Sequence, residues 1–270
     1  MTDDLLRSLL PTHGEGIDPV AMARRDLVKQ LPARFYAEVG VEARDGLFAL
    51  TLDGKQARTP KRTPLAHASR EIVDAMATEW AAQCDVINPA AMPMTRLVTS
   101  ALDGVAHDMD GTLAEAVKYA GSDMLCYRAG DPQSLVARQA AAWDPVLAWA
   151  RDELGARFVL SQGVMFVEQP AKAIEAICGR VERLREPVAV AALASMTALT
   201  GSVLLSLAVW AGRLTPEAAW SAAHVDEDFQ ISQWGEDAEA SERRARRWGE
   251  MQAAALALAS ARGEWRARED

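Results

Sequence analysis

A stretch without any charged residue, from Pro187 to Gly212, constrains the fold of this chain more than any other feature. It is long enough to cross a lipid bilayer as a helix. Much of it is alanine, serine, threonine and glycine, however, which favour membrane insertion only weakly, and Gly201-Ser202 interrupts it midway. Since a helix that is apolar on every face can equally lie at the centre of a helical protein, we expect a buried core helix here and no membrane span.

Upstream of this run, the sequence has the period of a half-buried strand. Apolar and polar residues alternate from Phe35 to Val41, and a second short apolar run covers residues 47–52. Asp45-Gly46 and Asp53-Gly54 follow these two runs, and glycine there supplies the positive φ of a tight turn. We therefore predict a small antiparallel meander.

Most of the remaining sequence has helical spacing, which the high alanine content also favours. Ser69 and Ser134 are expected to cap two helices, and Pro145 to kink or split the second. Thr215-Pro216 is a strong start signal for another helix. The last helix is expected from about Asp237 to Arg262. Its predicted inward face comprises Ser241, Ala245, Trp248, Gln252, Ala255 and Ala259.

These patterns predict an α+β fold, with a small N-terminal antiparallel-sheet α+β domain followed by a larger, all-helical, orthogonal bundle-like domain. The predicted boundaries are a leader with one short amphipathic helix at 1–33, the small domain at 34–109 and the helical domain at 110–270. A further alternating run at 157–168 predicts a short hairpin added to the sheet. The tryptophans expected in the core are Trp80, Trp143, Trp149 and Trp210.

The overall charge limits the classes of partner. The formal net charge is −9, whereas nucleic acids and anionic membranes require a basic face. Cys84, Cys126 and Cys178 are too scattered for a disulfide framework or a zinc site. We expect reduced thiols in the core of a cytoplasmic protein, because the first residues do not resemble a targeting peptide.

Catalytic signatures are missing from the sequence. It has no GxxxxGK[ST] loop, no GxGxxG behind a strand, no GxSxG and no HExxH. Its four histidines lie far apart, so that no local spacing suggests a nucleophile with its base. We therefore predict no catalytic residue and no cofactor.

One segment, 224–242, is unusual because it packs acids around three large apolar residues. Its acids are Asp226, Glu227, Asp228, Glu236, Asp237, Glu239 and Glu242, and its apolar residues are Phe229, Ile231 and Trp234.

Three hypotheses compete for this segment. The acids can complement a helix dipole or simply be solvated, with local ion pairs such as Glu239 to Arg243 and Glu242 to Arg246. His224, Asp226 and Asp228 alternate and could hold a hard metal ion. Alternatively, aromatic anchors beside an acidic rim could form a surface that binds a basic partner.

Several strings, in order along the chain, resemble the assembly-chaperone family that attends the α subunit of ATP synthase. They begin with Arg34-Phe-Tyr and continue with Leu52-Asp-Gly-Lys, Glu79-Trp80, Ile87-Asn-Pro, Met92-Pro-Met-Thr-Arg-Leu, Asp123-Met-Leu-Cys-Tyr-Arg, Trp143-Asp-Pro, Gly201-Ser-Val-Leu-Leu-Ser-Leu-Ala, Asp226-Glu-Asp-Phe-Gln and Trp234-Gly-Glu-Asp-Ala-Glu-Ala. The resemblance covers roughly residues 34–258.

The resemblance implies a two-domain fold, no catalysis and no nucleotide requirement. It implies a chaperone that holds the newly made α subunit until the β subunit replaces it, and we expect a cytoplasmic monomer. The partner-binding residues predicted on this basis are Glu236, Asp237, Trp234, Asp226, Glu227, Phe229 and Glu239. The alternative is an enzyme, a metal-dependent small hydrolase or transferase that uses the carboxylates at 224–236.

Overall fold

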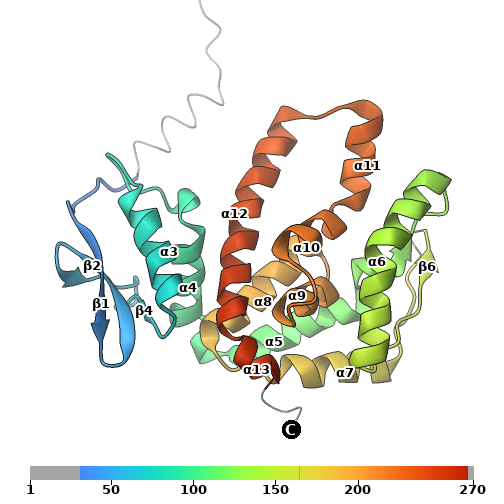
Figure 1. The fold of residues 1–270 in the computed structure, drawn as a ribbon, viewed down its shortest axis with the longest axis horizontal. Helices are drawn as coiled ribbons and strands as arrows, with labels where there is room; N and C mark the ends of the chain where they lie inside the picture. The colour runs from blue at the N-terminus through green and yellow to red at the C-terminus, as the bar shows by residue number, and fades with distance from the viewer. Residues whose placement is uncertain (1–30, 164, 267–270) are drawn as a thin grey trace, which may run out of the picture. The chain divides into compact units, whose positions relative to one another are not determined.

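The computed structural model describes residues 31–163 and 165–266 (Figure 1). These residues form two compact units, one of 31–35 with 82–88 and one of 36–81 with 89–266. In the smaller unit, Ala33 and Val86 form an antiparallel bridge, and the amide of Ile87 donates to the carbonyl of Pro32 at 2.8 Å. The leader helix predicted within 1–33 lies outside the described residues, and the predicted domain boundaries stay predictions.

The larger unit begins with a four-stranded antiparallel sheet in which β2 pairs with each of the other strands. Its strands are β1 (Val39–Arg44), β2 (Leu47–Leu52), β3 (Lys55–Gln56) and β4 (Ala66–His67). Asp45 and Gly46 have φ values of 51° and 79°, and Asp53 and Gly54 repeat this conformation. Both tight turns predicted from the Asp-Gly pairs are therefore confirmed.

The first strand starts at Val39, later than the predicted Phe35. The amides of Ala37 and Glu38 donate to the Asp53 carboxylate at 2.9 and 2.8 Å, so this part of the chain bonds to a turn side chain and not to a strand. Tyr36 is buried and Phe35 is 71% exposed. The predicted alternation is therefore wrong at its first two positions.

Helix α3 (Arg70–Ala81) packs on β1 and β2 and buries Ile72, Val73 and Met76. Trp80, which was predicted to lie in the core, is half-buried. The helix ends at Ala81, so Cys84 lies beyond it and is exposed, contrary to its predicted place in the core.

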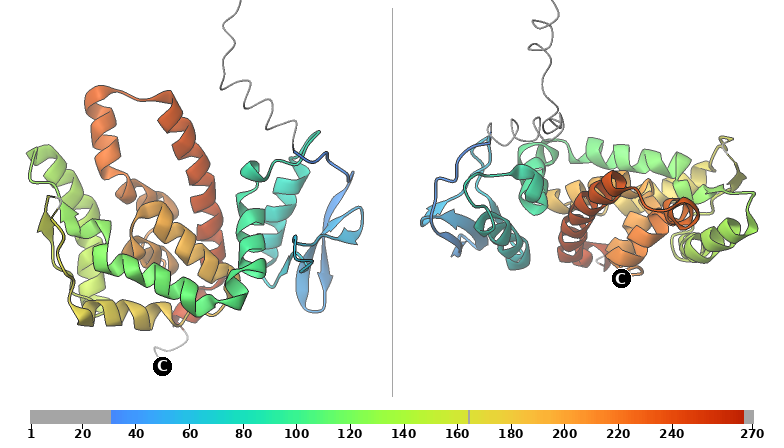
Figure 2. Two further views of the ribbon diagram at one scale, coloured as in Figure 1. Left: turned by 180° about the vertical axis from the view of Figure 1, so that it is seen from behind. Right: turned by 90° about the horizontal axis from the view of Figure 1, so that it is seen from above.

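The rest of the larger unit is helical, as Figures 1 and 2 show. Its helices are α4 (Pro93–Asp103), α5 (Met109–Lys118), α6 (Gln133–Glu153), α7 (Ala171–Val181), α8 (Pro187–Thr200), α9 (Val203–Trp210), α10 (Pro216–Ala223), α11 (Val225–Trp234), α12 (Ala238–Ser260) and α13 (Arg262–Arg266). Short 3-10 turns lie at Pro89–Ala91, Val105–His107, Tyr119–Ser122 and Met124–Cys126. The α+β fold class predicted from the sequence is confirmed.

The charge-free run forms α8 and α9 at the centre of the helical part, where α8 packs against α4, α5, α9 and α12. Gly201 closes α8 with a φ of 68°, a conformation that favours glycine. The Ser202 hydroxyl caps α9 by accepting from the amide of Leu205 at 3.1 Å. No helix among the described residues is both long and apolar enough to traverse a membrane. The predicted buried helical run is confirmed, and it is interrupted at Gly201-Ser202, as the sequence indicated.

Asp123 joins a distant segment to the start of α9. Its carboxylate is completely buried and accepts from the Ser202 hydroxyl at 2.9 Å and from the Leu204 and Leu125 amides at 3.2 and 3.1 Å. Burial raises the pKa of Asp123 to about 6, although these hydrogen bonds act in the opposite direction.

The hairpin predicted at 157–168 is wrong. Residues Ser161–Gln162 form β6, which pairs in parallel with β5 (Tyr127–Arg128) in a separate two-stranded sheet. The Gln169 side-chain amide bonds both the amide and the carbonyl of Val159, at 2.8 and 2.9 Å. A side chain thus takes the backbone groups that a second hairpin strand would need.

Two helix predictions also need correction. Helix α6 starts at Gln133, just before the predicted cap Ser134, and includes Pro145 without a break, so that the predicted split there is wrong and the predicted kink stays a prediction. On α12, Ala245 and Gln252 are exposed although predicted inward, while Met251, Ala254 and Leu258 are buried. Of the core tryptophans, Trp143 and Trp210 are buried as predicted, and Trp149 is half-buried.

Candidate partner-binding site

The acidic segment, 224–242, contains the whole of one helical arm, α11, and the start of a second, α12, and the turn 235–237 joins the two arms (Figures 1 and 2). Gly235 ends α11 with a φ of 90°, which favours glycine. The Asp237 carboxylate accepts from the amide of Ala240 at 2.7 Å and so caps α12. The helix start predicted at Asp237 is confirmed.

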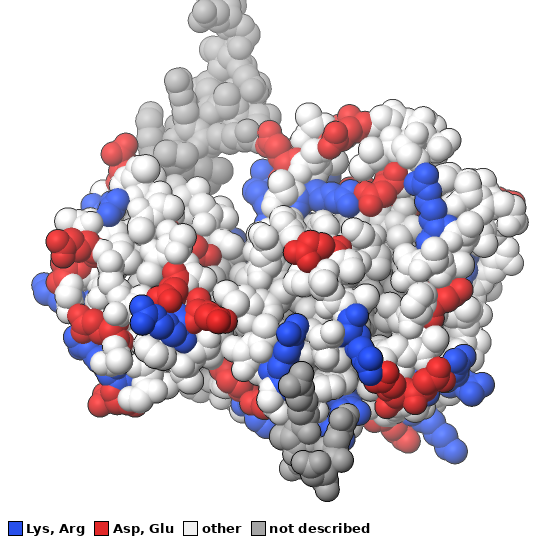
Figure 3. All heavy atoms as spheres, viewed as in Figure 1, with Lys and Arg blue, Asp and Glu red and all other residues white. Residues whose placement is uncertain are grey.

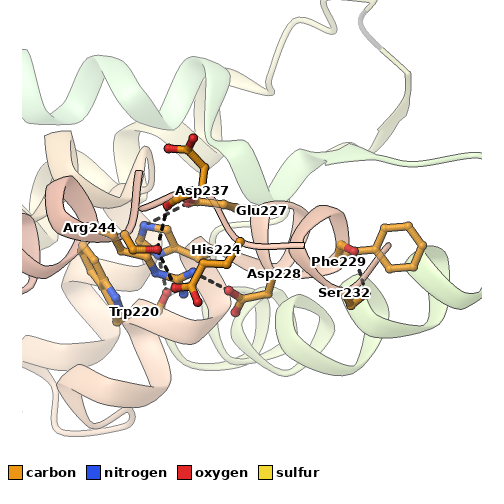
Figure 4. A network of polar contacts seen from close by, with 10 residues as sticks. Trp220, His224, Glu227, Asp228, Phe229, Ser232, Asp237 and Arg244 are labelled. Carbon is orange, nitrogen blue, oxygen red and sulfur yellow. Dashed lines mark hydrogen bonds and ion pairs between the residues drawn. The ribbon is translucent and has the colours of Figure 1, made fainter. Parts of the chain in front are cut away.

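Helical spacing places two predicted site residues on the α6 side of α11. The Asp226 carboxylate accepts from the side-chain amide of Gln139, on α6, at 2.7 Å. Phe229 is only 7% exposed, and the Arg138 guanidinium lies 5.2 Å from its ring centre. Figure 4 shows the Phe229 ring pointing away from the group formed by Trp220, His224 and Arg244. Asp226 and Phe229 therefore fasten α11 to α6.

The other predicted residues of α11 border a cleft of about 580 Å³ between α11 and α12. Glu227 and Trp234 line it from α11, and Glu236 and Asp237 line it from the turn. Trp234 is 79% exposed although it is the largest apolar side chain of the segment. The structure thus brings together four of the seven predicted site residues around one concavity.

Glu239 lies outside this cleft. Its side chain is 81% exposed and lies 3.8 Å from Arg243, as the predicted pairing requires. Glu242 and Arg246 form the second predicted pair at 3.6 Å. Exposed pairs of this kind contribute little to stability.

Two tryptophans that the sequence did not assign to a site line the cleft, and the ring of His224 lies beside one of them. Trp220, on α10, and Trp248, on α12, lie with their ring centres 5.5 Å apart. The His224 ring lies 4.1 Å from Trp220 and hydrogen-bonds through Nδ1 to the Trp220 carbonyl at 2.7 Å. Burial lowers the pKa of His224, and the nearby Arg244 and Arg247 act in the same direction. His224 is therefore neutral near pH 7.

Arg244 connects the two arms through an ion pair with Asp228. This hydrogen bond raises the pKa of Arg244, and the charges of Glu227 and Glu236 add to the effect. Figure 3 shows basic side chains in the hollow between α11 and α12 and acidic side chains around it.

The structure does not place His224, Asp226 and Asp228, the residues of the metal-site hypothesis, together as ligands. Asp226 faces α6, Asp228 pairs with Arg244, and His224 is bonded to a backbone carbonyl. Across 31–163 and 165–266, no group of three or more His, Cys, Asp or Glu residues is placed to hold a metal ion.

Two of the thiols are poor nucleophiles, because burial raises the pKa of Cys178 and raises that of Cys126 to about 12.

Comparison with known proteins extends the resemblance found in the sequence. The family model described as ATP12 chaperone protein matches residues 33–151. The Atu1473 protein of Agrobacterium tumefaciens, described as a candidate chaperone, has 48% sequence identity, coverage of 92% of each chain and a TM-score of 0.81.

Atp12 from Paracoccus denitrificans is also similar to this chain. Its crystal structure has 37% identity and a TM-score of 0.76, with coverage of 84% of this chain and 97% of that one. A mutant of the same protein matches with 36% identity and a TM-score of 0.75. Sequence and fold therefore agree over most of the chain.

Proposed function

Because this chain belongs to the ATP12 chaperone family, we propose that it binds the unassembled α subunit of ATP synthase and aids assembly of the catalytic head. An unpartnered subunit exposes the apolar surface that its neighbours normally cover, and such a surface promotes aggregation. A chaperone must cover this surface reversibly, without chemistry. We further propose that the protein acts as a monomer in the cytoplasm and is not an enzyme.

The observation that supports this proposal best is the exposed Trp234 beside the acidic turn 235–237, at the mouth of a cleft. Exposed tryptophans are typical of residues that become buried on binding. Acidic side chains around such an anchor favour association with a basic surface. We propose that Glu236, Asp237, Trp234 and Glu227 contact the client, while Asp226 and Phe229 hold α11 in place; Glu239 is assigned to solvent.

The test is selective binding by the full-length chain. We expect it to retain isolated α subunit on an affinity column and to retain neither isolated β subunit nor the assembled catalytic head. Equal retention of free and assembled α subunit, or a preference for β, would contradict the proposal. Because the sequence lacks a phosphate-binding loop, ATP should bind no tighter than about millimolar, which calorimetry can check.

A further inference from the structure

We infer that the cleft between α11 and α12 receives an arginine side chain of the client, with its guanidinium between the carboxylates of Glu227, Glu236 and Asp237 and against the Trp234 indole. This inference rests on the proposed function and specifies the chemistry of the partner at that site. It also assigns different roles to neighbouring acids of one segment.

The first argument is geometric. Glu227, Ile231 and Trp234 follow one another at helical spacing and face the cleft, whereas Asp226 and Phe229 face α6. The volume of about 580 Å³ lies within the range of pockets that enclose small ligands. A client side chain with its flanking residues can therefore enter between the arms.

The second argument is charge. The lining of the cleft contains three carboxylates and one guanidinium, that of Arg244, which Asp228 already pairs. Glu236 accepts a hydrogen bond from the Ser241 hydroxyl, and Asp237 accepts one from a backbone amide. Glu227 lies 3.8 Å from His224, whose lowered pKa keeps it neutral near pH 7. Within the described chain, none of the three carboxylates forms an ion pair with a Lys or Arg. The charge of Arg244 acts on Glu227 and Glu236, but three carboxylates against one guanidinium leave the lining of the cleft with a net negative charge.

The third argument is the combination of carboxylates with an exposed indole. A planar guanidinium can bond a carboxylate through two N–H groups and stack on an aromatic face at the same time. A lysine ammonium is a compact, strongly hydrated charge and gains less from the indole. Ile231 and Trp248 add apolar surface for the methylene stem of the same side chain. The site therefore fits arginine better than lysine.

The experiment compares matched variants of the full-length chain for affinity to isolated α subunit. Glu236→Gln should weaken binding at least tenfold, and Glu239→Gln, which makes the same charge change three residues away, should change it less than twofold. Trp234→Ala should weaken binding at least tenfold, and Phe166→Ala, at another exposed aromatic residue, should change it less than twofold. Equal effects within either pair overturn the inference.

A photoreactive benzoylphenylalanine replacing the exposed Gln233 then identifies the client segment by crosslinking and mass spectrometry. We expect the crosslinked segment of the α subunit to contain an arginine. Replacing that arginine by glutamine should weaken binding at least tenfold to the unmodified chaperone, and less than threefold to Glu236→Gln, because the two charges are coupled. A segment without arginine, or fully additive effects of the two changes, overturns the inference.

Failure of the inference and failure of the proposed function give different results. If the unmodified chain does not bind α subunit, the proposed function is wrong, and the inference falls with it. If the unmodified chain binds α subunit and both Glu236→Gln and Trp234→Ala bind equally well, the chaperone function stands and only the cleft is excluded.

Discussion

Trp143 offers the sharpest test of the helical packing. It lies on α6, is 1% exposed, and donates from Nε1 to the carbonyl of Ala222 at 2.7 Å. The Arg128 guanidinium lies 5.2 Å from its ring centre. Truncating a buried tryptophan to alanine costs about 3–5 kcal/mol, and here it also leaves the Ala222 carbonyl without its partner. We expect Trp143→Ala to lower the free energy of unfolding by about 4 kcal/mol.

Trp143→Phe separates the two contributions. Phenylalanine retains most of the buried ring but cannot donate to the Ala222 carbonyl, so it should cost roughly 1–3 kcal/mol. Equilibrium urea unfolding followed by far-ultraviolet circular dichroism measures both variants at an unchanged m-value. Trp234→Ala is the control, because that indole is 79% exposed and its loss should change stability by less than about 0.5 kcal/mol. A transition midpoint of Trp143→Ala equal to that of the unmodified chain would refute this packing.

Three further outcomes are expected. Burial raises the pKa of Asp123 to about 6, so between roughly pH 4 and 6 the folded chain holds a proton that the unfolded chain has released. As the pH rises through this window, the free energy of unfolding of the unmodified chain should therefore fall by about 3 kcal/mol relative to that of Asp123→Asn. Parallel pH profiles of the two free energies of unfolding would contradict this. Asp237→Ala should lower the free energy of unfolding by about 1 kcal/mol through loss of the α12 cap, whereas Asp237→Asn, which can still cap, should be nearly neutral; thermal melts that do not distinguish the two exclude the capping role. Iodoacetamide should modify the exposed Cys84 of the native chain well before the buried Cys126, and peptide mapping that finds equal rates would place Cys126 at the surface.

Local signals in the sequence predicted several starts and ends of elements correctly. Gly201-Ser202 broke the apolar run where α8 ends and α9 begins, and Thr215 caps α10 by accepting from the amide of Ala218 at 3.2 Å. Both Asp-Gly pairs form the turns of the sheet. In each case the residues that determine the conformation lie within four positions of it, so one short window contains all the necessary information.

Contacts between distant segments could not be predicted in this way. The Glu79 carboxylate, on α3, accepts from the amides of Met94 and Thr95 at 2.6 and 2.8 Å and so caps α4, whose own N-cap residue Met92 makes no side-chain bond. The Asp123 carboxylate likewise accepts from the Leu204 amide in the first turn of α9, 81 residues along the chain, in addition to the cap that Ser202 provides. Nothing in the sequence next to either helix indicates which carboxylate will reach it.

The alanine-rich α12 shows a different limit. Its predicted inward stripe followed correct helical spacing but was rotated, since Ala245 is exposed and Met251 is buried. Because alanine is compatible with buried and exposed positions alike, a helix with so many alanines has several stripes of similar hydrophobicity. The side that faces α8 is then determined by the few large residues, such as Met251 and Leu258.

In the acidic segment, local spacing predicts part of the arrangement and contacts between distant residues determine the rest. Its composition alone does not show which acids serve binding and which serve folding. Once α11 is bounded at Val225–Trp234, helical spacing separates Asp226, on the α6 side, from Glu227, on the cleft side. Ion pairing then separates Asp228, which contacts Arg244, from Glu236, which forms no ion pair with a described Lys or Arg and interacts with the charge of Arg244 only at longer range. Like charges gathered around a cleft repel one another and destabilise the folded state, whereas a client cation would relieve this repulsion. We therefore expect Glu236→Gln to leave thermal stability unchanged or slightly higher while it weakens binding to the α subunit. Replacement of an acid that serves folding would instead lower thermal stability, so the direction of the stability change distinguishes the two roles.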